Sequence, residues 1–154
     1  MDGNIQFSFD ITALNLSGTD ASGGVEAMEG TGNDYNYKLQ LIGSNYFSQG
    51  DITIVGLRYA DGDDRDVYSL NFNTRFLVSR NLRVNPRFRM DSRKNRVNNT
   101  GQMIYRPSIR LDYRVKNRLS LEAEIGGEYS NREITDDSGI DSSYFISVGY
   151  RADF

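Results

Sequence analysis

Hydrophobic and polar residues alternate with a period of two along most of the chain. The clearest run lies at 82–91, where Leu82, Val84, Pro86, Phe88 and Met90 alternate with Arg83, Asn85, Arg87, Arg89 and Asp91. The same alternation continues through 103–115 and 119–126. A strand points successive side chains to opposite faces, whereas a helix would spread these residues around its circumference. The pattern therefore predicts long β-strands that have one apolar face and one charged face.

Applied to the whole chain, this pattern predicts eight strands. They span 4–16, 34–47, 50–60, 66–79, 81–92, 102–116, 118–131 and 142–154. These segments exceed the usual soluble strand of about 5–6 residues. They also reach the length of about 9–11 residues that a tilted strand needs to cross a bilayer. Strand length is thus a first indication of a membrane protein.

The segments between the predicted strands alternate between long and short. Long connections are expected at Ser17–Asn33, Asp61–Arg65, Ser92–Gly101 and Asn131–Asp141, and short turns near Ser48–Gln49, Ser79–Asn81 and Lys116–Arg118. Outer-membrane barrels have short periplasmic turns and longer extracellular loops. We therefore expect an all-β fold, a transmembrane antiparallel up-and-down β-barrel of eight strands. Residues 1–154 would form its single domain, with both termini on the short-turn side.

Composition excludes several other classes of protein. No run of 18 apolar residues occurs in the 154-residue chain, so no transmembrane helix is expected. The net charge of −3 gives no indication of a nucleic-acid partner, and the absence of cysteine excludes thiolate metal sites. The absence of histidine removes the usual catalytic dyads and zinc sites. We therefore assign no catalytic residue, metal or cofactor. The first residues, Met1–Asn4, show no signal-peptide pattern, so an exported chain would be a mature form.

The last strand carries the most specific motif in the chain. Tyr144, Ile146, Val148, Tyr150, Ala152 and Phe154 fall on one face of it. This ending resembles the terminal strand of bacterial outer-membrane β-barrel proteins, and the chain from about Arg65 onward resembles the C-terminal barrel segment of larger members. The resemblance implies a Gram-negative outer-membrane location with periplasmic termini. It also implies lipid as surroundings, and Tyr150 and Phe154 as the signal read by the barrel-assembly machinery. A fold resemblance assigns no activity.

Charged residues alternate with the apolar face and would point into a barrel. The expected lumen charge network consists of Arg83, Arg87, Arg89, Arg106, Arg110, Arg114, Asp112, Glu122, Glu124 and Glu128. Further inward charges would be Lys38, Arg58, Arg75, Arg151, Asp10, Asp91 and Asp153. One interpretation is a structural or anchoring barrel whose interior is filled by Arg–Glu pairs. The alternative is a porin-like channel, or part of one, whose arginines pass small anionic solutes. A soluble lipocalin-type barrel is a third possibility, and it would fold without detergent.

Two further patterns have simpler interpretations. Tyrosines near the predicted strand ends suggest interfacial girdles; they are Tyr46, Tyr59, Tyr68, Tyr113, Tyr129, Tyr144 and Tyr150. The acidic run Asp61–Asp66 lacks the spacing and closing glutamate of an EF-hand, so we interpret it as a polar hairpin loop.

Overall fold

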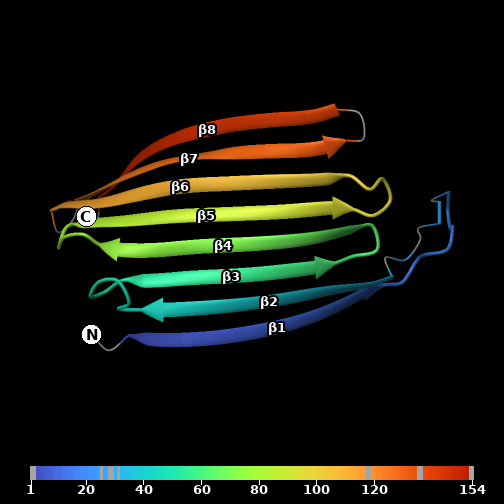
Figure 1. The fold of residues 1–154 in the computed structure, drawn as a ribbon, viewed down its shortest axis with the longest axis horizontal. Helices are drawn as coiled ribbons and strands as arrows, with labels where there is room; N and C mark the ends of the chain where they lie inside the picture. The colour runs from blue at the N-terminus through green and yellow to red at the C-terminus, as the bar shows by residue number, and fades with distance from the viewer. Residues whose placement is uncertain are drawn as a thin grey trace.

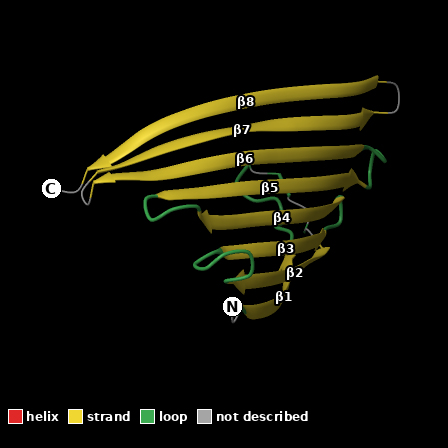
Figure 2. Cartoon of the chain, turned by 60° about the vertical axis from the view of Figure 1, so that its left-hand side comes forward, coloured by secondary structure: helices red, strands yellow, loops and turns green. Residues whose placement is uncertain are grey.

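The protein is an all-β chain whose strands form a single sheet (Figure 1). The computed structural model describes residues 3–24, 26–27, 30, 32–116, 119–134 and 137–152. Its strands are β1 (Asn4–Leu16), β2 (Gly32–Ser44), β3 (Ile52–Asp61), β4 (Arg65–Leu77), β5 (Leu82–Asn95), β6 (Gly101–Lys116), β7 (Leu119–Ile134) and β8 (Asp137–Ala152). Within these residues there is no helix, and hence none that is long and apolar enough to cross a membrane (Figure 2).

Every strand pairs antiparallel with its neighbours in sequence. The order in the eight-stranded sheet is β1-β2-β3-β4-β5-β6-β7-β8, which confirms the predicted up-and-down arrangement. The registers keep the alternation in phase from strand to strand. Phe72, for example, is opposite both Val55 and Phe88, and Ile125 is opposite both Ile109 and Ile146. One face of the sheet is therefore apolar across all eight strands and the other is polar.

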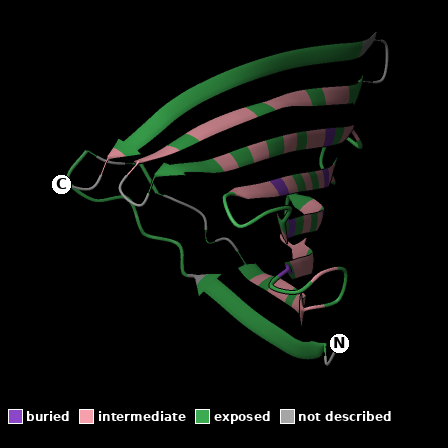
Figure 3. Ribbon diagram, turned by 90° about the vertical axis from the view of Figure 1, so that its left-hand side faces the viewer, coloured by how far each residue is buried: buried purple, intermediate pink, exposed green. Residues whose placement is uncertain are grey.

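The sheet is open, so the predicted closure of eight strands into a barrel is not present. Among the described residues no ladder joins β1 to β8, and the two strands form opposite edges of the curved sheet (Figure 3). The interior of an eight-stranded barrel is only wide enough for its own side chains. Here the polar face carries long arginine side chains on β3, β4, β5, β6 and β8, which a more open curvature accommodates.

Strand positions agree with the prediction to within a few residues except at the last hairpin. Asn131–Asp141 was expected to be a long loop, but β7 runs to Ile134 and β8 starts at Asp137. The ladder continues from Ser130↔Asp141 to Ile134↔Asp137. Polar residues on both faces of this stretch resemble the sequence of a loop, but a solvent-exposed strand accepts such residues equally well.

The predicted alternation of loop lengths is also wrong. The connection 17–31 is long as expected, but 62–64 is shorter than 45–51, which belongs to the opposite end of the sheet. The other connections within the described residues are 78–81 at that opposite end and 96–100 at the end that carries 17–31. We call the end with 45–51 and 78–81 the turn side, and the end with 17–31 and 96–100 the loop side.

The apolar face is not covered by a second layer. Ile104, which is 3% exposed, is the only buried apolar residue among those described, and it lies on the polar face. Large apolar side chains on the other face stay exposed, for example Phe7 at 63%, Ile125 at 51% and Val148 at 78%. A soluble sheet buries such a face against another element. The described chain provides no such element, so a wide apolar surface faces outward.

Aromatic side chains lie at both ends of this apolar face. On the loop side, the rings of Tyr59 and Tyr68 stack with centroids 4.6 Å apart, and Tyr37 and Tyr35 extend the stack. Tyr129 lies against Tyr105 at 6.2 Å on neighbouring strands. On the turn side, Tyr113 and Tyr150 flank Leu121, Phe47 contacts Phe76, and Tyr46 is exposed beside Phe47. Tyr144 is opposite Gly127 and is 88% exposed.

Candidate functional site

The polar face is organised around a buried carboxylate on β5. Asp91 is 1% exposed and accepts hydrogen bonds from Arg89 Nε at 2.9 Å and from Arg106 Nη1 at 2.8 Å. Arg106 Nε donates a further hydrogen bond to Glu128 Oε2 on β7, at 2.6 Å. Arg89 and Arg106 are directly opposite each other in the β5–β6 register. Asp91 therefore neutralises two arginines that would otherwise repel each other.

A second cluster, nearer the turn side, reverses the charges. Asp112 and Glu122 are directly opposite each other on β6 and β7. Arg110 bridges them, with Nε 2.9 Å from Asp112 Oδ1 and Nη2 2.9 Å from Glu122 Oε2. Asn85 donates to the other oxygen of Asp112 at 2.7 Å. In both clusters, a like-charged pair across the ladder is thus bridged by one residue of the opposite charge.

The structure brings most of the predicted network residues together. Those with ion pairs are Arg87, Arg89, Arg106, Arg110, Asp112, Glu122, Glu124 and Glu128, although Arg87 and Glu124 are 3.8 Å apart. Arg83 and Arg114 lie on the same face without an ion pair among the described residues. Asp91 was expected only as one inward charge and is instead central to the network. Asp153 and Phe154 lie outside the described residues, whereas Tyr150 is on the apolar face of β8.

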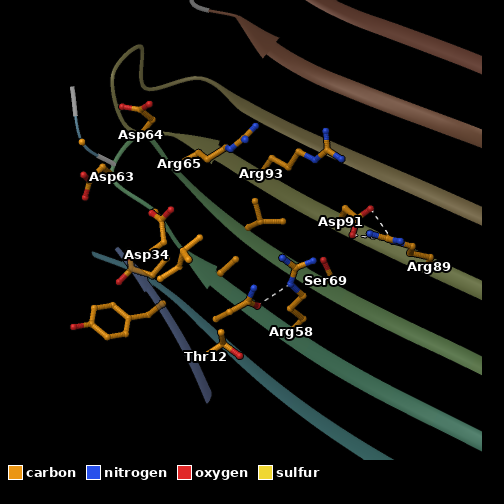
Figure 4. A pocket seen from close by; sticks show the side chains of 18 residues that line it. Thr12, Asp34, Arg58, Asp63, Asp64, Arg65, Ser69, Arg89, Asp91 and Arg93 are labelled. Carbon is orange, nitrogen blue, oxygen red and sulfur yellow. Dashed lines mark hydrogen bonds and ion pairs between the residues drawn. The ribbon is translucent and has the colours of Figure 1, made fainter. Parts of the chain in front are cut away.

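The polar face is hollowed along its length. A loop-side hollow of about 920 Å³ lies over Arg58, Ser69, Arg89 and Asp91, with acidic residues of the 62–64 connection at its rim (Figure 4). A central hollow of about 460 Å³ and a turn-side hollow of about 830 Å³ continue it. The three hollows are lined mainly by residues of the polar face. This face is therefore concave, and it could line a water-filled space.

Charge differs between the two ends of this concave face. The loop-side hollow is lined by four arginines (Arg58, Arg65, Arg89, Arg93) and five aspartates (Asp34, Asp61, Asp63, Asp64, Asp91). The described residues that line the turn-side hollow include six arginines (Arg75, Arg83, Arg87, Arg110, Arg114, Arg151) and two carboxylates, Asp112 and Glu122. The face is thus close to balanced at the loop side and strongly cationic at the turn side.

The acidic hairpin loop at Asp61–Asp66 is fastened by an arginine that the sequence did not single out. Arg96 Nη2 lies 2.5 Å from Asp61 Oδ1 and 2.6 Å from Asp66 Oδ1, and its Nη1 donates to the Gly62 carbonyl at 3.1 Å. The hydrogen bonds that Arg96 donates to Asp66 and, to a smaller extent, to Asp61 raise the pKa of Arg96 above its ordinary value. These carboxylates therefore bind an arginine. The described residues contain no group of three or more Asp or Glu side chains placed to hold a metal ion.

A second residue missed by the sequence analysis shapes the turn 45–51. The Asp51 side chain, 1% exposed, accepts hydrogen bonds from the backbone N–H groups of Tyr46, Phe47 and Ser48 at 2.6–3.1 Å. Burial opposes the charge on Asp51, but these N–H groups outweigh it and lower its pKa below the ordinary value of 3.8. Asn45 and Gly50 take positive φ angles, which lets the turn close around the carboxylate. The turn then displays Tyr46 and Phe47 at the edge of the apolar face.

Comparison with known proteins adds no family to this description. No family model, no curated protein and no solved structure matches the chain. Function must therefore be argued from the two faces and the charges they carry.

Proposed function

We propose that this chain forms part of the wall of a bacterial outer-membrane β-barrel pore that is wider than eight strands. The apolar face would contact lipid, and the concave polar face would line the lumen and pass small anionic solutes. A single observation carries this proposal: one open sheet has an uncovered apolar face, and its polar face is concave and hollowed. A bilayer covers such an apolar surface without any second protein layer.

The free edges of β1 and β8 support a wider barrel. An open sheet cannot stay in a bilayer, because its unpaired N–H and C=O groups would meet hydrocarbon. Because the sheet has an even number of strands, β1 and β8 run in opposite directions. An even number of further strands would therefore continue the up-and-down order from β8 back to β1. Further strands would thus extend both the apolar and the polar face without a break. Barrels of about 16–18 strands enclose an aqueous channel.

Cysteine cross-linking tests how the edges are closed, because the chain contains no natural cysteine. A Phe7→Cys, Val148→Cys double variant places one thiol on each edge strand, both on the apolar face. In a wider barrel, oxidation in vesicles should give no cross-link within one chain, whereas cross-links between chains would identify a second copy as the closing partner. An efficient cross-link within the chain, tested with thiols at several registers along β1, would show that eight strands close on themselves and would overturn the wider barrel.

A filled, structural barrel is the second candidate, and the paired charges favour it. Asp91 holds Arg89 and Arg106, and Arg110 holds Asp112 and Glu122, so much of the polar face neutralises itself. Recordings in planar bilayers separate the two candidates. The pore predicts steady channels that prefer anions under a salt gradient. A barrel that inserts into the bilayer but shows no conductance would support the structural role instead.

A further inference from the structure

We propose that Arg75, Arg83 and Arg114 form a binding site for soluble phosphate groups at the turn side of the polar face. The site deepens the proposed pore function, since it names the solutes that the cationic end of the lumen would attract. It rests on the arrangement of three arginines and on the pairing of both carboxylates that line this hollow within the described part of the chain.

The three arginines lie on three neighbouring strands and on the same face. Arg83 on β5 is opposite Leu77 of β4 and Asp112 of β6. Arg75 and Arg114 each lie two residues along from those partners, so both are diagonal neighbours of Arg83. Diagonal neighbours in a sheet are roughly 7–8 Å apart at the backbone. Arg75 and Arg114 lie on opposite sides of Arg83 along the strands, so the long side chain of Arg83 can share an oxyanion with either of them.

The carboxylates of the turn-side hollow are already bound by other residues. One oxygen of Asp112 accepts from Arg110 and the other accepts from Asn85. Glu122 is paired with Arg110 as well. Arg75, Arg83 and Arg114 make no ion pair or side-chain hydrogen bond among the described residues, although all three line the hollow. Within the described part of the chain, these three positive charges on the concave wall therefore stay uncompensated.

The chemistry of arginine selects the ligand. A guanidinium group presents its N–H donors in a planar fork that matches the oxygens of phosphate and binds them in pairs. Several such forks around a hollow favour an ion with more than one negative charge over chloride. The arginines lie on the face opposite the uncovered apolar surface, which favours a soluble phosphate compound over a lipid headgroup. The loop side is less suitable, because aspartates are in excess there.

The test is calorimetric titration of the detergent-refolded chain with pyrophosphate, repeated with chloride at equal ionic strength. The triple variant Arg75→Gln, Arg83→Gln, Arg114→Gln should raise the dissociation constant at least about tenfold, which corresponds to the loss of one or more charged hydrogen bonds. The matched control is Arg93→Gln. It removes an arginine of the loop-side hollow, on the same strand as Arg83, and should leave binding unchanged. The triple variant should stay folded, because it removes charges that repel one another. The folded state is checked by gel mobility, which should change on boiling as much as it does for the parent chain.

Three results would overturn the site: no pyrophosphate binding by the parent chain, equal binding by the triple variant, or an equal loss in Arg93→Gln. The outcome is separate from that of the pore. A chain that binds pyrophosphate through these arginines but forms no channels keeps the site and loses the pore. A chain that conducts anions without this binding keeps the pore and loses the site.

Discussion

If the uncovered apolar face contacts lipid, the cost of placing a charge on it should depend on the depth of that residue in the bilayer. Ile125 lies near the middle of β7, in a row with Ile109 and Ile146 on the neighbouring strands. Leu121 is on the same face, four residues nearer the turn side, between Tyr113 and Tyr150. If this face meets lipid, Arg substituted for Ile125 would be near the bilayer midplane, whereas Arg substituted for Leu121 would be near the aromatic boundary.

The size of the effect follows from strand geometry. Four residues at about 3.3 Å each cover roughly 13 Å along the strand. A strand tilt of about 40° reduces this to roughly 10 Å along the membrane normal, and the apolar band of a barrel ends about 12 Å from its middle. Ile125→Arg should therefore cost about 2–4 kcal/mol of folding free energy, and Leu121→Arg only about 0–1 kcal/mol.

The assay is a urea titration of the chain folded into phosphatidylcholine vesicles, followed by gel mobility without boiling. Ser147→Arg is the matched control, because Ser147 lies next to Ile146 in sequence but faces Glu124 on the polar side of the sheet. A charge there should cost little. The interpretation fails if Ile125→Arg destabilises no more than Ser147→Arg. Folding of Ile125→Arg in plain buffer with unchanged stability would indicate a soluble sheet instead.

Three further predictions concern single features of the sheet. Asp91→Asn should cost about 2–3 kcal/mol, because it leaves two arginines without their shared charged acceptor; urea titration should show a much smaller loss for Glu128→Gln, whose side chain is 42% exposed. Gly126→Ala should cost about 1–3 kcal/mol by overpacking, since a Cβ there would lie 2.7 Å from both the Phe145 ring and Ser108 Cβ; Gly149→Ala, with open space around it, should be tolerated, and equal unfolding midpoints for the two would refute the packing argument. Asp51→Asn should lower the unfolding midpoint at neutral pH, and the gap to the parent chain should close on acidification. A lowered folded-state pKa means that the contribution of Asp51 is present above 3.8 and is lost as pH falls through the folded value, so a gap that widens below pH 3.8 would contradict it.

Much of the sheet could be predicted because its strands share one simple pattern. The alternation at 82–91 sets which side chains share a face, and the neighbouring segments repeat it in register. Closure could not be predicted in this way, because a period of two is the same in an open sheet and in a barrel. The last hairpin was misjudged because polar residues such as Ser130 and Asp141 occur in loops and in water-exposed strands alike.

The partners within the charged face were harder to predict than its composition. Arg106 and Glu128 were expected to belong to one network, but the central role of Asp91 depends on the register between β5 and β6. The connection 96–100 joins these two strands and so helps to set that register. Within it, Arg96 donates a hydrogen bond to Asp66 of the β3–β4 hairpin. The same holds for Asp51, whose backbone partners exist only once the turn has formed.

The strand order has a consequence for how such a wall can be built. Every ladder joins strands that are consecutive in the chain. Each strand can therefore pair with the preceding one after closing only a short loop. If the wall closes into the proposed barrel, only the contact between the first and the last strand has to form between parts that are distant in the sequence. A hairpin could therefore be gained or lost without reversing which side chains face inward. The circumference of the proposed barrel could then change in steps of two strands while the chemistry of its wall is retained.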